Sequence, residues 1–272
     1  MKEIAVRAAT GAVYVALVLG AAWAGPWTTL MLFLPVCAIA AREWHALIAD
    51  GDDNVPSLSV TMVMATAAFV ATAIVPMLPA WGSHHAAAAI LVLLLVSILD
   101  LMRRGVGDPA RALALCISTI ALIALPFASV THLVHMHWHV FIGFMILLWT
   151  NDTGAYLTGR AIGRHKLMPT VSPGKTWEGL LGGIGSTLGM AWLIALGWKE
   201  LPLALWIASA VVISVSSTIG DLLESALKRA KGVKDSGSLL PGHGGILDRF
   251  DGFLLAAPAM LLLVKLFERS GP

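Results

Sequence analysis

The chain has 272 residues, of which 58% are hydrophobic and only 12% are charged. A soluble globular domain carries about 25% charged residues, so this composition excludes an ordinary soluble protein and indicates a polytopic membrane protein. The formal net charge of +2 does not by itself point to any partner. The two cysteines, Cys37 and Cys116, lie in apolar runs, where we expect them to be buried rather than to bind zinc.

Apolar segments of about 20 residues cross a bilayer as helices. We therefore expect an all-α fold, a single integral membrane domain over residues 1–272 with about nine transmembrane helices. Residues 1–134 would supply the N-terminal spans, and residues 135–272 the spans and loops that carry a site. The expected spans lie near residues 4–24, 27–48, 57–78, 84–102, 110–130, 135–158, 176–198, 201–227 and 248–268.

The lysines and arginines indicate the orientation, because they gather in cytoplasmic loops. With the N-terminus inside, fifteen of the 18 fall in inside segments, and only Lys199, Lys265 and Arg269 fall outside. We therefore predict an N-in, C-out topology, which places the polar loops described below in the cytoplasm.

Several histidines fall in two expected outside loops. His135, His137 and His139 alternate in a way that could suggest a metal site, but no Cys, Asp or Glu accompanies them in the sequence. We interpret them as an interfacial loop beside Trp138.

The sixth expected span closes on Asn151 and Asp152, followed by the basic, glycine-rich stretch 159–164. A charge inside a bilayer costs roughly 2.5–3.5 kcal/mol at the centre of a helix, so such a residue marks a functional site by default. The alternative is a polar contact between two helices.

A second polar motif, SPGKTWEG, covers residues 172–179. We expect Ser172 to cap a helix that begins at Pro173, with Lys175, Thr176 and the amides of the first turn available to an anion. The spacing is not that of a Walker loop, and the alternative is a capped helix start with an interfacial tryptophan.

The third motif begins in the eighth expected span. Ser217, Asp221, Ser225 and Lys228 follow one another at helical spacing and share one face of that span. The chain then turns through PGHGG at residues 241–245, whose glycines let the backbone approach a ligand closely.

Asp221 and Asp248 come from helices that we expect to face each other, so their carboxylates can converge on one point. Carboxylate oxygens, completed by waters and substrate phosphates, are the ligands that Mg²⁺ prefers. The alternative is a salt-bridged loop in which Asp248 pairs with Arg249 or Lys234. That alternative does not account for the glycine turn or for a carboxylate inside the eighth span.

Over roughly residues 148–255, and most specifically in a motif at residues 225–251, the chain resembles the phosphatidate cytidylyltransferase, or CDP-diacylglycerol synthase, family. The resemblance is highly specific because every fixed position of a long motif is filled without a gap. The residues that carry it are Ser225, Leu227, Lys228, Arg229, Lys234, Asp235, Gly237, Leu240, Pro241, His243, Gly244, Gly245, Ile246, Asp248, Arg249, Phe250 and Asp251. The two upstream polar motifs also resemble the family, whereas the N-terminal half matches only in being apolar.

The resemblance implies an enzyme of phospholipid biosynthesis that joins CTP to phosphatidic acid, giving CDP-diacylglycerol and pyrophosphate. The lipid phosphate is already anionic, so no general base is needed, and cations carry most of the catalysis. The resemblance also implies Mg²⁺ as cofactor, with a second metal ion left open. The protein would be a multi-pass enzyme of the inner (cytoplasmic) membrane with its active site facing the cytoplasm. CTP, phosphatidic acid and the bilayer would be its partners, without nucleic acid, and a homodimer is left open.

The same resemblance assigns the site residues. Asp221 and Asp248 would bind Mg²⁺, while Lys228, Arg229 and Lys234 would hold phosphates. The residues expected in catalysis are Lys228, Arg229, Lys234, Asp235, His243, Arg249 and Asp251. The residues expected to bind substrate are Asn151, Asp152, Ser172, Lys175, Thr176, Glu178, Ser225, Gly244 and Gly245.

Three other classes of protein compete with this interpretation. A transporter also carries polar residues in broken helices, but near the bilayer midplane between repeats, and here they cluster at helix ends without a visible repeat. An enzyme that uses CTP with another lipid phosphate is harder to distinguish from the phosphatidate enzyme by sequence. A purely structural membrane protein would have little use for the charged cluster.

Overall fold

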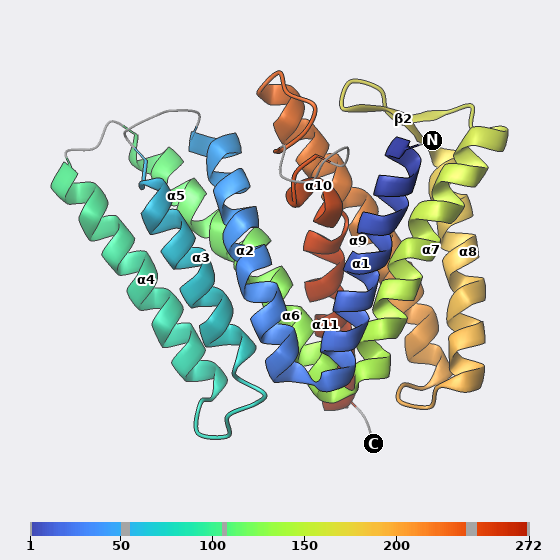
Figure 1. The fold of residues 1–272 in the computed structure, drawn as a ribbon, viewed down its shortest axis with the longest axis horizontal. Coiled ribbons are helices and arrows are strands. Elements are labelled where there is room, and N and C mark those ends of the chain that lie inside the picture. The colour runs from blue at the N-terminus through green and yellow to red at the C-terminus, as the bar shows by residue number, and fades with distance from the viewer. Residues whose placement is uncertain (1, 50–54, 105–107, 238–243, 271–272) are drawn as a thin grey trace. The chain divides into compact units, whose positions relative to one another are not determined.

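A computed structural model describes residues 2–49, 55–104, 108–237 and 244–270 (Figure 1). These residues are helical apart from one short hairpin and the connections. They form two compact units: Met1–His135 with Asp235–Arg249, and Met136–Lys234 with Phe250–Pro272.

The first unit contains the N-terminal helices. They are α1 (Lys2–Ala24), α2 (Pro26–Ala49), α3 (Leu58–Ala73), α4 (Ser83–Arg104), α5 (Pro109–Thr119), the π-helix η1 (Ile120–Ala124) and α6 (Leu125–Met136), whose last residue enters the second unit.

Local signals begin and end these helices. Gly25, with φ of 116°, separates α1 from α2, which begins at Pro26. Asp108 caps α5 by accepting a hydrogen bond from the backbone N–H of Arg111 at 3.0 Å, with Pro109 at the first helical position. α2 packs on α3, and α3 packs on α4 and η1, around buried aromatic residues such as Phe33 and Phe127, whose ring centroids lie 5.9 Å apart.

The second unit contains α7 (Trp138–Ile162), α8 (Trp177–Gly197), α9 (Leu203–Ala230) and α11 (Phe253–Ser270). The short α10 (Leu247–Phe250) belongs to the first unit except for its last residue, Phe250. α8 packs on α7 and α9, and α9 packs on α11. α7 and α8 approach closely because a glycine lies at their contact: a Cβ atom on Gly182 would lie only 2.1 Å from Thr158 Oγ1.

Seven of the described helices are long and apolar enough to cross a membrane: Pro26–Ala49, Ser83–Arg103, Pro109–Met136, Trp138–Ile162, Trp177–Gly197, Leu203–Ala230 and Leu247–Arg269. Two shorter apolar helices, Gly11–Ala24 and Leu58–Ala73, fall in the first and third predicted spans. The prediction of a helical, polytopic membrane protein is therefore confirmed at this level. Exposed apolar side chains on α4, such as Leu91 and Leu95 at 57% and 50% exposure, are suited to lipid.

One detail of the sequence prediction is wrong. Between α7 and α8 the chain forms an antiparallel hairpin of β1 (Lys166–Met168) and β2 (Ser172–Thr176). Ser172 does not cap a helix beginning at Pro173, since residues 172–176 are extended and pair with β1. Thr176 caps α8 instead and accepts a hydrogen bond from the backbone N–H of Gly179 at 3.1 Å.

Candidate active site

A cavity of about 470 Å³ opens in the second unit between α7, the hairpin, α8, α9 and the turn before α11. Polar residues from segments far apart in the sequence meet there. Those that the sequence predicted for the site are Asn151, Asp152, Ser172, Lys175, Thr176, Asp221 and Asp251.

Two consecutive residues of α7 contribute to this cavity in different ways. Asn151 is buried, and its Nδ2 donates to Ser217 Oγ of α9 at 3.0 Å. The contact between helices is thus made by Asn151, while Asp152 is exposed and lines the cavity. Asn151 Oδ1 is buried and has no hydrogen-bond partner within the described ranges of the chain.

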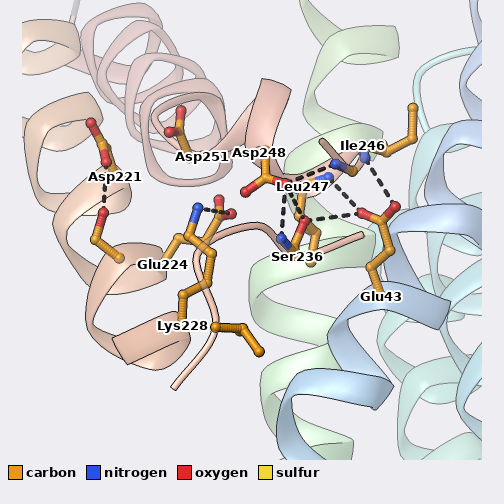
Figure 2. A network of polar contacts seen from close by, with 12 residues as sticks. Glu43, Asp221, Glu224, Lys228, Ser236, Ile246, Leu247, Asp248 and Asp251 are labelled. Atoms are coloured by element: carbon orange, nitrogen blue, oxygen red, sulfur yellow. Dashed lines mark hydrogen bonds and ion pairs between the residues drawn. The ribbon is translucent and has the colours of Figure 1, made fainter. Parts of the chain in front are cut away.

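Lys175 brings a positive charge into the cavity from strand β2, and Arg160 of α7 also lines it. Lys175 Nζ lies 2.6 Å from Asp221 Oδ2 and donates to the carbonyl oxygen of Thr218 at 3.4 Å. Asp221 Oδ1 accepts a hydrogen bond from Ser225 Oγ at 3.1 Å, a contact drawn in Figure 2. Asp221 and Ser225 therefore share one face of α9, as their spacing predicted.

Asp251 enters the cavity because α9 has a glycine where the chain crosses it. A Cβ atom on Gly220 would lie 2.6 Å from the carbonyl oxygen of Asp251, so only glycine permits this approach. The cavity is thus lined by the carboxylates of Asp152, Asp221 and Asp251 and by two basic side chains, Lys175 and Arg160. The three carboxylates outnumber the two basic groups, one of which is already paired with Asp221, an arrangement that favours cations.

These three carboxylates do not form a tight three-ligand cluster: among the described residues only His137, His139 and Glu200 do so, with ligand atoms within 4.8 Å of one another. Looser carboxylates fit Mg²⁺, which usually keeps several waters and takes one or two carboxylates together with substrate phosphates.

Further along α9, Lys228 makes an ion pair with the buried Glu224, a residue not predicted for the site. Lys228 Nζ lies 3.0 Å from Glu224 Oε1, with side-chain exposures of 12% and 2% (Figure 2). The spacing of four residues between the glutamate and the lysine was the available signal. Arg229 and Lys234, the other two predicted phosphate ligands, are exposed.

In the first unit, Glu43 of α2 organises the segment that leads into α10. Its Oε1 accepts a hydrogen bond from the backbone N–H of Ile246 at 3.0 Å, and its Oε2 from that of Leu247 at 2.8 Å (Figure 2). Ser236 Oγ also donates to Glu43 Oε2 at 3.3 Å. Glu43 is not among the residues predicted for the site, although a carboxylate inside an apolar span is a signal for it in the sequence.

Asp248 belongs to the same network. Its Oδ2 accepts hydrogen bonds from the backbone N–H groups of Ser236 and Gly245, both at 2.8 Å, and from Ser236 Oγ at 3.0 Å (Figure 2). One oxygen of Asp248 thus holds the two ends of this segment together. The amide of Gly245, expected to face substrate, donates to Asp248.

The predicted site residues divide between the two units. The second unit holds Asn151, Asp152, Ser172, Lys175, Thr176, Glu178, Asp221, Ser225, Lys228, Arg229, Lys234 and Asp251, and the first holds Asp235, Gly244, Gly245, Asp248 and Arg249. His243 lies outside the described residues. Glu178 fixes the base of the hairpin, where its carboxylate accepts from the backbone N–H groups of Arg164 and His165. The convergence of Asp221 and Asp248 stays a prediction.

Comparison with known proteins identifies the family to which this helical chain, with its cavity lined by carboxylates, belongs. A model of the cytidylyltransferase family matches residues 5–267, nearly the whole chain. The chain therefore belongs to the cytidylyltransferase family.

Several similar proteins are all named as one enzyme of that family. A phosphatidate cytidylyltransferase of Staphylococcus haemolyticus is 33% identical over 244 residues, which cover 87% of this chain and 90% of the relative. Phosphatidate cytidylyltransferases of Staphylococcus saprophyticus and Bacillus subtilis are 40% and 46% identical over shorter alignments, which span 58% and 46% of those relatives. The predicted membership in the phosphatidate enzyme family, and with it the prediction of an enzyme, is confirmed.

Proposed function

We propose that the chain transfers the cytidylyl group of CTP to the phosphate of phosphatidic acid, releasing pyrophosphate. The observation that carries this proposal is the cavity that Asp152, Asp221 and Asp251 line together with Lys175 and Arg160, in a chain of the cytidylyltransferase family. The names of the relatives support phosphatidic acid as the lipid substrate.

The residues of the cavity suit a reaction between two anionic phosphates. The attacking oxygen of the lipid phosphate already carries charge, so a base is not required, and the main barrier is electrostatic. Lys175 is paired with Asp221 at 2.6 Å, which holds its charge in the cavity. We expect Lys175 to turn to the substrate phosphates when another cation neutralises Asp221.

A divalent cation fits the donor set of the cavity, because its three carboxylates outnumber its two basic side chains, Lys175 and Arg160. Asp221, together with Asp248, would hold Mg²⁺, and Asp152 and Asp251 lie in the same cavity as Asp221. When bound, Mg²⁺ would neutralise phosphate charge and stabilise the leaving pyrophosphate. Lys228, which is held by Glu224, and the exposed Arg229 and Lys234 would guide the phosphates.

We also propose that the whole chain is one membrane domain of nine spans, with the N-terminus in the cytoplasm and the C-terminus outside. The bias of lysine and arginine along the sequence supports this orientation. The enzyme would then lie in the inner membrane with its cavity open to cytoplasmic CTP. A homodimer stays a prediction.

The direct test uses the full chain purified in detergent with phosphatidic acid, labelled CTP and Mg²⁺. We expect label in the lipid extract and release of pyrophosphate, both lost with EDTA and with Asp221→Ala. Glu268→Gln, a carboxylate paired with Lys265 and 47% exposed, is the matched control and should keep full activity. If label appears only with another lipid phosphate, that lipid and not phosphatidic acid is the substrate. If no lipid takes up label, the transporter alternative is favoured.

The metal assignment is tested by measuring activity against Mg²⁺ concentration in Asp221→Asn and Asp248→Asn. Loss of a ligand should raise the Mg²⁺ concentration for half-maximal activity at least 10-fold, by analogy with the roughly 10–100-fold cost of losing a residue that supports a metal ligand. Asp248 also holds three donors of its own segment, so a purely structural role would lower thermal stability and leave the Mg²⁺ requirement unchanged. That second result would remove Asp248 from the metal site.

A further inference from the structure

A second cluster of metal-ligating side chains lies in the second unit, away from the cavity. His137 is the N-cap of α7, His139 lies in its first turn, and Glu200 lies in the connection between α8 and α9. Asp152 lies more than three turns further along α7 than His139, roughly 20 Å along the helix axis. The hairpin and the α8–α9 connection likewise lie at opposite ends of α8 (Figure 1). The cluster is therefore separate from the candidate active site.

The three side chains already have the spacing of metal ligands. Their ligand atoms lie within 4.8 Å of one another, and His137 Nδ1 is 3.3 Å from Glu200 Oε1. His139 Nδ1 contacts the same carboxylate oxygen. Two ligands of a tetrahedral zinc ion, each about 2.0–2.2 Å from the metal, are roughly 3.4 Å apart. Small side-chain movements would thus be enough to place one ion among them.

The carboxylate of Glu200 supplies the second, independent observation. Its Oε2 is buried and has no hydrogen-bond partner in the part of the chain that the structure describes. The adjacent Lys199 does not neutralise it, since Lys199 Nζ donates to the carbonyl oxygen of Ala195 at 2.8 Å. A buried carboxylate oxygen without a donor costs free energy. A cation bound beside it would remove that cost.

The imidazole rings are held in place by their surroundings. The ring of His139 stacks on that of Trp198, with centroids 4.6 Å apart and an interplanar angle of 8°. His137 Nδ1 accepts a hydrogen bond from the backbone N–H of His139 at 3.2 Å. A metal bound through His137 Nε2 leaves this cap of α7 intact, whereas binding through Nδ1 replaces it.

We propose that His137, His139 and Glu200 form a binding site for a divalent transition metal, with Zn²⁺ as the expected ion, that ties the start of α7 to the α8–α9 connection. Imidazole ligands favour zinc and its neighbours over Mg²⁺ and Ca²⁺. Three protein ligands leave a fourth position of a tetrahedral ion for water. The sequence showed the alternating histidines but not their acidic partner, because Glu200 lies 61 residues after His139.

The test measures zinc on the full chain, purified in detergent without a polyhistidine tag. The protein is stripped with EDTA, returned to buffer and dialysed against Zn²⁺ with Mg²⁺ in large excess, which occupies sites built from oxygen ligands. Bound zinc is determined by elemental analysis. We expect one zinc ion per chain and a higher melting temperature of the unmodified protein with zinc than without it.

His139→Ala and the isosteric Glu200→Gln should each weaken zinc binding at least 10-fold and abolish the zinc-dependent rise in melting temperature. The matched control replaces His84 and His85, two neighbouring histidines outside the cluster, by alanine and should bind zinc like the unmodified chain. Absence of tight zinc on the unmodified protein, or zinc retained by either variant, would overturn the proposal. The first of these measurements does not depend on whether a variant folds.

Discussion

Glu43 is an acidic residue in an apolar helix, only 7% exposed, and it is tolerated there because its carboxylate is fully used. Two backbone N–H groups, of Ile246 and Leu247, and the hydroxyl of Ser236 donate to it. A buried charge without such donors would cost far more than the bonds return. The residue therefore holds in place the segment that carries Asp248.

The first prediction concerns Glu43→Gln. The amide group of glutamine would turn its NH₂ toward a backbone N–H, which leaves at least one buried donor without an acceptor. We expect a loss of about 1–3 kcal/mol in the free energy of unfolding, because a buried donor left without an acceptor costs about this much. The measurement is the melting temperature of the variant in detergent, which should be lower than that of the unmodified chain.

Glu268→Gln is the control for Glu43→Gln, because Glu268 pairs with Lys265 at an exposed position where a salt bridge contributes little. Its melting temperature should match that of the unmodified chain. Equal melting temperatures for Glu43→Gln and the unmodified chain would mean that the network does not hold the segment.

At the level of elements, α9 carries Asp221 and also sets the position of Asp251 through Gly220. Alanine is the better helix former by about 1 kcal/mol, so Gly220→Ala would stabilise an isolated helix. In the folded protein its Cβ atom would lie 2.6 Å from the carbonyl oxygen of Asp251. The turn before α11 would have to move away from α9.

The second prediction is therefore that Gly220→Ala lowers cytidylyltransferase activity by about 100-fold, because a displacement of about 1 Å at a catalytic group can cost this much. The measurement is the rate of CMP transfer to lipid. Gly189→Ala in α8 is the matched control, since a Cβ atom there meets nothing within 4 Å. An active Gly220→Ala variant would show that the position of Asp251 is unimportant for the reaction.

Each predicted span contains a helix, and the shared face of Asp221 and Ser225 followed from their helical spacing. The hairpin did not follow, because Pro173 after a serine is also the pattern of a helix start, and the pairing of Lys166 with Thr176 is not visible in local sequence. Contacts between residues far apart in the sequence could not be predicted from local sequence either. Lys175 meets Asp221 across the fold, and Glu43 meets Ile246 over 203 residues.

At the scale of the whole chain, the distribution of lysine and arginine predicts how the chain is oriented in the membrane. α8 has 21 residues, a length of roughly 31 Å, which matches a hydrocarbon core of about 30 Å. The exposed hairpin residue Lys166 precedes it and the exposed Lys199 follows it. If α8 spans the bilayer, these two lysines must lie on opposite sides.

The third prediction is that Lys166→Cys faces the cytoplasm and Lys199→Cys faces outward, as the excess of basic residues around the hairpin requires. In sealed right-side-out vesicles, a membrane-impermeant maleimide should label Lys199→Cys at once and Lys166→Cys only after permeabilisation. Cys37 and Cys116 are 0% and 3% exposed, so the unmodified chain should label weakly and serves as the control. The reverse pattern would place the hairpin, and the cavity that it helps to form, outside the cell. CTP could not then reach the cavity from the cytoplasm, and the proposed reaction would fail with the topology.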